Sequence, residues 1–280
     1  MTGSEPTPRT FEFGKNWAAF LPTIDERRID SAKASMMSML GASRLDQQTF
    51  LDIGCGSGLS SLAAVRLGAT VHSFDADPRC IAVTRELKHR FAPHSEDWII
   101  EHGSAIDETY LTKLDRYDIV YSWGVLHHTG IMDKGINLAA DRVVPGGRLF
   151  IAIYNDQGRA SQRWTGIKQT YQRLPNPLRL GWVGIIASYY ELKFAAARAY
   201  QGRNPLPFSD WKRKTEDRGM SVWHDWVDWI GGWPFETATP HKVIDRMQTR
   251  GFVLEKMKSV GNGWGCNEFV FRHAQDLKSS

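Results

Sequence analysis

The sequence predicts an α/β protein with a mostly parallel sheet, and three observations support that class. A strand runs directly into a turn with glycine at every second position, Gly54-Cys55-Gly56-Ser57-Gly58, and a helix starts behind it. The next strand ends in an acid, Asp75. Short apolar strands then alternate with helical segments as far as Tyr154, which is the pattern of a parallel sheet covered by helices.

The glycine turn and the acid together predict a binding site. Glycines let the backbone approach a ligand that side chains would hold away. The carboxylate of Asp75, at the tip of the second strand, suits the two hydroxyls of a ribose. We therefore expect a ligand that contains an adenosine-like sugar. The alternative is a glycine-rich turn that serves only the fold of some other α/β protein.

The spacing of the glycines argues against a dinucleotide. The fingerprint G-x-G-x-x-G would require a glycine at position 59, where the chain has Leu59, and the third glycine is instead Gly58. Asp52 stands two residues before Gly54. A buried acid there would repel a pyrophosphate, but it can accept hydrogen bonds from loop amides or, through water, from an ammonium group.

The other elements follow in a regular order. Further strands are predicted at 99–102, 117–122, 148–154, 252–260 and 266–272, and helices at 24–40, 132–143 and 241–249. Pro145-Gly146-Gly147 is predicted to form the turn that leads into the strand at 148–154.

This order of motifs resembles the core of class I S-adenosylmethionine-dependent methyltransferases, over about 50–155 and 237–272. The resemblance implies a Rossmann-like seven-stranded sheet with one antiparallel strand, and S-adenosyl-L-methionine as the cofactor. It also implies a helical insert after the fifth strand and an amino-terminal helical cap. We accordingly predict four segments: a cap at 1–48, the cofactor-binding core at 49–155, the insert at 156–236, and a final helix and β-hairpin at 237–280.

The resemblance also assigns cofactor contacts. The glycine loop approaches the methionine and ribose portions, Asp75 takes the ribose hydroxyls, and Ser104 and Ala105 border the adenine. Many relatives have an acid where this chain has Ser104, and Asp107 is a possible substitute. The predicted cofactor-binding residues are Asp52, Gly54, Cys55, Gly56, Gly58, Asp75, Ala76, Ser104, Ala105, Asp107, Ser122 and Trp123.

The segment after the fourth strand bears on the substrate. Methyltransferases of exocyclic base amines or glutamine amides have an [N/D]-P-P-[Y/F] motif there, whereas this chain has Ser122-Trp123-Gly124-Val125. The continuation Val125-Leu126-His127-His128 resembles methyltransferases of small metabolites, in a widespread bacterial group. We expect methyl transfer to a hydroxyl of a small or medium-sized metabolite. A thiol, an amine, a lipid or quinone, and RNA stay open as acceptors.

Transfer to a hydroxyl requires removal of a proton, and histidine titrates near neutrality. We rank His128 and His127 first as the base, because their loop lies at the reactive end of the donor. Packing of one of them under the sheet edge is the alternative. The further catalytic candidates are His224, Tyr154 and Asp156, and the predicted substrate-binding residues are Trp17, Asn155, Trp223 and Trp226.

The insert differs from the rest of the chain in composition. Seven of the eleven tryptophans lie between Trp164 and Trp233, and 156–218 carries twelve Lys and Arg against five Asp and Glu. Trp223, Trp226 and Trp229 recur every three residues, so on a helix they line one face, as core packing or as the wall of a pocket. The basic charge favours an anionic substrate or, as a less favoured interpretation, RNA; a solvated helix surface would show the same charge.

Cysteine usage and hydropathy indicate the cellular compartment of the protein. Three cysteines without C-x-x-C spacing indicate neither a disulfide framework nor a zinc site, and we expect no metal. The sequence shows neither a signal peptide nor an apolar run long enough to span a membrane. We expect a cytoplasmic protein.

Overall fold

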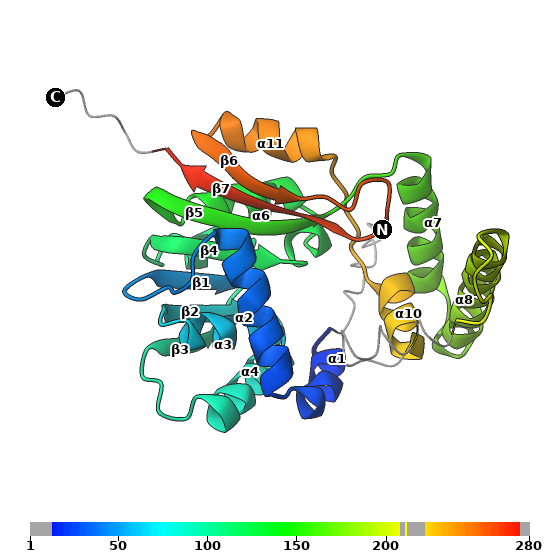
Figure 1. Ribbon diagram of the computed structural model, residues 1–280, viewed down its shortest axis with the longest axis horizontal. Coiled ribbons are helices and arrows are strands. Elements are labelled where there is room, and N and C mark those ends of the chain that lie inside the picture. Colours follow the sequence, from blue (N-terminus) through cyan, green and yellow to red (C-terminus); the bar gives the residue numbers. More distant parts are fainter. Residues whose placement is uncertain (1–12, 208–210, 212–221, 275–280) are drawn as a thin grey trace, which may run out of the picture. The chain divides into compact units, whose positions relative to one another are not determined.

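The computed structural model describes residues 13–207, 211 and 222–274 (Figure 1). It divides into two compact units. One consists of Arg159–Trp233, and the other of the described residues of Glu12–Gly158 and Pro234–Ser280. The larger unit contains the whole sheet, and the smaller unit is helical.

The sheet has seven strands in the order β3-β2-β1-β4-β5-β7-β6. Their bounds are β1 Thr49–Ile53, β2 Thr70–Asp75, β3 Trp98–His102, β4 Tyr117–Trp123, β5 Val143–Tyr154, β6 Phe252–Lys258 and β7 Cys266–His273. β7 pairs antiparallel with both β5 and β6, and the other pairs are parallel. The predicted seven-stranded, Rossmann-like sheet with one antiparallel strand is therefore confirmed.

Helices cover both faces of this sheet (Figure 1). The helices of the larger unit are α1 Phe13–Phe20, η1 Leu21–Thr23, α2 Glu26–Leu40, α3 Leu59–Arg66, α4 Pro78–Phe91, α5 Glu108–Leu111, η2 Leu126–His128, α6 Met132–Ala140 and α11 Pro240–Gln248. Side chains of α5, α6 and α11 share one buried apolar cluster with the strands. α3 and α4 lie against β1, β2 and β3 on the other face, and α2 packs on α3. Burial on both faces explains why β1, β4 and β5 are nearly continuous apolar runs.

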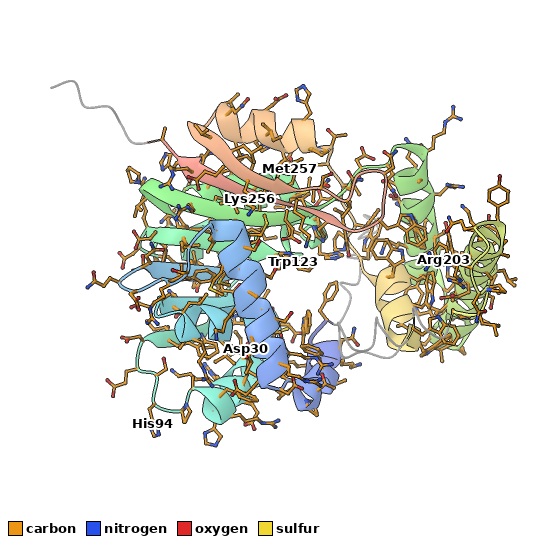
Figure 2. All side chains as sticks on the ribbon, in the orientation of Figure 1. Asp30, His94, Trp123, Arg203, Lys256 and Met257 are labelled. Atoms are coloured by element: carbon orange, nitrogen blue, oxygen red, sulfur yellow. The ribbon has the colours of Figure 1, made fainter. Side chains whose placement is uncertain are left out.

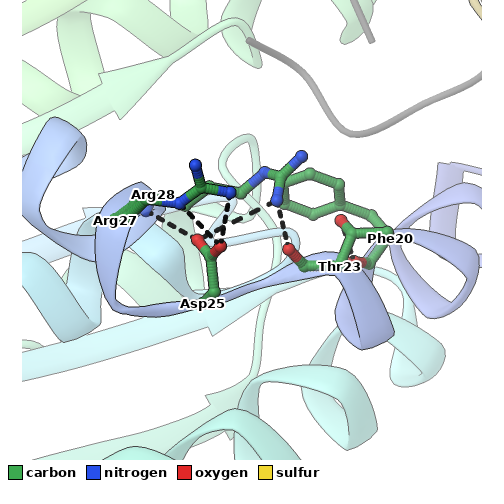
Figure 3. A network of polar contacts seen from close by, with 5 residues as sticks. All are labelled: Phe20, Thr23, Asp25, Arg27 and Arg28. Carbon is green, nitrogen blue, oxygen red and sulfur yellow. Dashed lines mark hydrogen bonds and ion pairs between the residues drawn. The ribbon is translucent and has the colours of Figure 1, made fainter. Parts of the chain in front are cut away.

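The turn before α2 is fixed by a small polar network (Figure 3). The Asp25 carboxylate accepts the backbone N–H of Arg28 at 2.9 Å and so caps the helix. The Arg28 guanidinium donates to the carbonyl of Thr23 and lies 6.0 Å from the centroid of the Phe20 ring. Caps of this kind stabilise a helix by about 0.5–2 kcal/mol.

The prediction of a turn before the fifth strand is wrong, because the strand starts earlier than expected. β5 begins at Val143, and Pro145-Gly146-Gly147 lies inside it as an irregularity in the pairing with β4. The strands approach closely there, because a Cβ on Gly147 would lie 2.8 Å from the carbonyl oxygen of Asp118. The two glycines therefore allow a β-bulge to bend the strand without ending it.

The smaller unit is built from α7 Arg159–Arg173, α8 Asn176–Tyr200 and α10 Val222–Gly231. Its core is aromatic: Trp164 stacks on Tyr190 at 4.9 Å between ring centroids and meets Trp229 edge-on at 5.5 Å. Lys168 is fully buried, donates to the carbonyl of Trp229 at the end of α10 and lies 5.1 Å from the centroid of its ring. A cation at a helix carboxyl end is stabilised by the helix dipole as well as by the hydrogen bond.

Candidate functional site

The loops that carry the predicted site residues leave the sheet along one edge. Parallel pairing places Ile53 beside Phe74, Asp52 beside Tyr121 and Trp123 beside Ala152. The carboxyl ends of β1, β2, β4 and β5 therefore meet at the same edge, on both sides of the point where the strand order reverses. Open α/β sheets bind their ligands at this place.

The loop after β1 is held in a conformation that suits glycine. Gly54, Gly56 and Gly58 have φ angles of 76°, 56° and 78°, in the left-handed region. A Cβ on Gly58 would lie 2.6 Å from the methyl carbon of Thr84. Gly58 is also the N-cap of α3, so the loop lies at the amino end of a helix, where an anionic or polar group is favoured.

Asp75 connects this loop to the end of β2. Its Oδ2 accepts the N–H of Gly56 at 3.0 Å, and its Oδ1 accepts the N–H of Asp77 at 2.8 Å. Burial raises the pKa of this carboxyl above its usual range, although the residue is still half-buried rather than enclosed. Each carboxylate oxygen can accept a second hydrogen bond. The Cys80 thiol also donates to this carboxylate. The side chain is therefore oriented, and it retains acceptor capacity for a sugar hydroxyl.

Asp52 belongs to a buried chain of hydrogen bonds behind the loop. Ser61 donates to its Oδ2 at 2.5 Å, Ser73 donates to Ser61 at 2.8 Å, and the Trp98 indole donates to Ser73 at 2.8 Å. Only 2% of Asp52 is exposed, and burial raises its pKa to about 7. In this arrangement Asp52 supports the loop from below, and direct contact with a ligand stays a prediction.

The residues predicted around the adenine lie between β3 and α5. Ala105 is buried, and the Ser104 hydroxyl accepts the N–H of Ile106 at 3.4 Å. Asp107 caps α5 by accepting the N–H of Tyr110 at 3.0 Å. A helix cap therefore accounts for one oxygen of Asp107, and its role as the substitute for the missing acid stays a prediction.

The remaining predicted cofactor-binding residues differ in exposure. Ser122 is buried and donates to the carbonyl of Ile53 at 3.1 Å, which ties β4 to β1. Trp123 is 45% exposed at the end of β4 (Figure 2). Cys55 is buried, with its sulfur 3.4 Å from the Thr84 hydroxyl, and Ala76 is exposed beyond the end of β2. Of these, Trp123 and Ala76 are exposed, and their contact with the cofactor stays a prediction.

Helix α1 covers the glycine loop. The N–H of Gly14 donates to Oδ2 of Asp77 at 3.0 Å, and the Phe13 ring lies 4.9 Å from that of His128. A Cβ on Gly56 would lie 3.0 Å from the Trp17 indole, so this ring rests directly over the loop. The sequence predicts a substrate contact for Trp17, and the structure places it against the predicted cofactor loop.

The two histidines after β4 lie in η2 and have different surroundings. Nδ1 of His128 is 2.6 Å from the carbonyl oxygen of Pro234. A carbonyl only accepts, so Nδ1 carries the hydrogen and, in the neutral ring, Nε2 is the nitrogen that can accept a proton. His127 is fully buried, accepts the N–H of Tyr154 on Nδ1 at 3.3 Å, and has its ring 3.8 Å from that of Tyr154. This burial favours the packing interpretation for His127.

Glu236 completes this turn, and the sequence does not predict its role. Its two carboxylate oxygens accept the N–H of Met132 at 3.2 and 3.0 Å and so start α6, while its own N–H donates to the carbonyl of His127 at 3.0 Å. Burial raises its pKa. No local pattern marks it, because an acid after Pro234 and Phe235 becomes a cap only when the fold brings it to Met132.

A family model described as a methyltransferase domain matches residues 20–185, more than half of the chain. The chain belongs to this family. The predicted class I, S-adenosyl-L-methionine-dependent methyltransferase is thereby confirmed.

Individual relatives share only part of this methyltransferase. The ubiquinone biosynthesis O-methyltransferase of Brucella melitensis is 34% identical over 111 residues, 40% of this chain and 43% of that protein. The chain thus matches less than half the length of that relative. A chain of the complex between the Haloferax volcanii Trm112 methyltransferase activator and a methyltransferase superposes with a TM-score of 0.55 at 12% identity, covering 96% of this chain and 100% of that one.

A second solved structure is also similar in fold. The PKMT2 protein of Rickettsia typhi, solved in complex with AdoHcy, gives a TM-score of 0.53 at 14% identity, covering 83% of this chain and 50% of that one. At such identities the two structures support the fold of the methyltransferase alone.

Two predicted residues after β5 form hydrogen bonds within the larger unit. The Asn155 amide donates to the carbonyl of Gly261 at 2.8 Å, and its oxygen accepts the Asn267 amide at 2.9 Å. Asp156 accepts the N–H of Gly158 at 2.8 Å. Both residues shape the loop that leaves β5 in this methyltransferase, and their contact with substrate stays a prediction.

The candidates on α10 are distributed between core and surface. Trp226 is buried and its indole donates to Glu191 at 3.1 Å, whereas Trp223 is 44% exposed. Trp226 and Trp229 therefore favour the packing interpretation of the tryptophan stripe. The side chains of His224 and Asp225 lie outside the described residues.

Proposed function

We propose that this methyltransferase transfers the methyl group of S-adenosyl-L-methionine to a hydroxyl of a small or medium-sized metabolite, with His128 as the base. The hydrogen bond from Nδ1 of His128 to the carbonyl of Pro234 is the observation that carries the proposal, because it fixes the tautomer that can take a proton on Nε2. Bound at this edge of the sheet, the cofactor supplies an electrophilic methyl group on a sulfur that is already charged.

The residues present fit that cofactor. The left-handed glycine loop keeps side chains off the backbone between β1 and α3, and Asp75 offers an oriented carboxylate to the ribose hydroxyls. Trp17 covers the loop, and a cover of this kind would keep water away from a bound donor. For this chain, catalysis then consists of three tasks: holding donor and acceptor aligned, keeping water out, and taking up on His128 the proton of the substrate hydroxyl.

Replacing Asp75 with alanine is expected to weaken cofactor binding about ten- to a hundredfold. Hydrogen bonds from neutral groups to a carboxylate contribute about 1.5–3 kcal/mol. Isothermal titration calorimetry with S-adenosyl-L-methionine measures the loss. Asp97→Ala, at an exposed acid between α4 and β3, is the matched control and should bind as the wild type does. Equal affinity of Asp75→Ala and the wild type would contradict the assignment.

A ring hydroxyl is the acceptor we favour among the metabolites. The support is the 34% identity with a protein named as a ubiquinone biosynthesis O-methyltransferase, over the part of the chain that is shared. His128 lies among the rings of Phe13, His127 and Tyr154, and aromatic surroundings suit an aromatic acceptor.

Methyl-labelled cofactor distinguishes the acceptors. Purified protein is incubated with it and a lysate, which is then separated into small-molecule, lipid, RNA and protein fractions, with a catechol assayed in parallel. Label on the catechol and in small molecules or extractable quinones is expected. Label confined to RNA or protein, or carried by sulfur or nitrogen, would contradict the proposed acceptor while leaving the cofactor assignment intact.

A further inference from the structure

Helix α8 has an apolar face that is exposed to solvent. Four large side chains on it, Leu178, Ile185, Tyr189 and Leu192, are between 57% and 71% exposed. Their spacing of seven, four and three residues places them on one side of the helix. We call these four residues the α8 stripe. Exposed apolar side chains that line up along a helix mark an interaction surface more often than single ones do.

The opposite face of α8 is already used. Val183, Ala187 and Tyr190 are buried, and Tyr190 stacks between Trp164 and Trp226 at 4.9 and 6.1 Å. The helix is therefore oriented by its own unit. The α8 stripe is a second apolar face of the same helix, and it takes no part in that packing.

Charge distinguishes the possible occupants of the stripe. Residues 159–207 contain eight Lys and Arg and one acid, Glu191, whose carboxylate accepts the indole N–H groups of Trp211 and Trp226. The exposed cations are Arg159, Arg163, Arg173, Lys193 and Arg203, the last labelled in Figure 2. Two copies of so basic a surface would repel each other, whereas an anionic surface attracts it.

We propose that α8 binds the surface of an anionic lipid bilayer, with the α8 stripe buried at the level of the headgroups. Lys193 adjoins Leu192 and Arg203 follows the helix, so both are placed to meet lipid phosphates. Among the residues that the structure describes, no helix is both long and apolar enough to cross a membrane. Association at the surface needs no such helix, since an amphipathic helix lies in the plane of the interface.

Vesicle flotation of the full chain tests this proposal independently of methyl transfer. We expect the wild type to float with phosphatidylcholine vesicles that contain phosphatidylglycerol. With vesicles of phosphatidylcholine alone, it should remain unbound at the bottom of the gradient. Ile185→Glu with Leu192→Glu should reduce binding at least tenfold, because two apolar side chains leave the interface. Lys193→Gln and Arg203→Gln should each reduce binding about fivefold.

The control variant is Val253→Glu, which adds a negative charge at a similarly exposed apolar position on β6 and should float as the wild type does. Circular dichroism and thermal unfolding establish that the stripe variant is folded. Unchanged flotation of the stripe variant would overturn the proposal. So would equal binding to neutral vesicles, or a dimer in ultracentrifugation that the stripe variant dissociates, since a second copy would then occupy the stripe.

Discussion

Replacing His128 with glutamine is expected to lower kcat about 10²–10⁴-fold, the usual contribution of a general base. Glutamine is close to histidine in size, but it cannot take up a proton at neutral pH. The affinity for S-adenosyl-L-methionine should stay within about twofold, because the predicted cofactor contacts come from the glycine loop and Asp75. Single-turnover methylation and calorimetry measure the two quantities separately.

Two further variants separate a loss of catalysis from a loss of stability. His94→Gln, at an exposed histidine before β3 (Figure 2), is the matched control and should keep full activity. His127→Gln should instead lower the free energy of unfolding, because that ring is fully buried against Tyr154. Turnover retained in folded His128→Gln would contradict the assignment of His128 as the base.

The second large effect concerns stability and pH, and its source is Asp52. Burial raises the pKa of this carboxyl from 3.8 to about 7 in the folded protein. Between these values the folded state binds a proton that the unfolded state has released, so stability falls as the pH rises through this range and levels off above it. By the size of the shift, the loss is on the order of 4 kcal/mol between pH 4 and pH 8.

Asp52→Asn should remove most of that dependence and make the cofactor-free protein more stable than the wild type at pH 8. The amide oxygen can still accept the Ser61 hydroxyl, and no charge is buried. Urea unfolding at several pH values measures the slope. Some slope should persist, because burial also raises the pKa of Asp75 and Glu236. Asp97→Asn, at an exposed acid, should show the same pH dependence of the free energy of unfolding as the wild type. The same dependence in Asp52→Asn would contradict the prediction.

The sheet could be predicted from the sequence because its signals are local. Each signal is contained in a few neighbouring residues: an apolar run, the glycines after β1, or the acid that ends β2. The order of strands and helices along the chain then predicts a parallel sheet. The error at Pro145-Gly146-Gly147 has the converse reason. Whether such a run ends a strand or bends it depends on the neighbouring strand, here on the carbonyl of Asp118.

The site was less predictable, because its decisive contacts join distant parts of the chain. His128 and His127 are adjacent and chemically alike in the sequence. They are distinguished by distant residues: Pro234 accepts from His128, and Tyr154 covers the buried His127. The cap made by Glu236 and the position of Trp17 over the loop have the same origin. Residue type and spacing do not contain this information.

The placement of α1 has a consequence for the order in which the molecule is completed. This helix is the first described element to leave the ribosome, yet the N–H of Gly14 has its partner 63 residues later, in Asp77, and Phe13 meets the ring of His128 beyond β4. Local contacts form early and distant ones late. A nascent chain therefore holds α1 without these partners until α4 and then η2 have been synthesised.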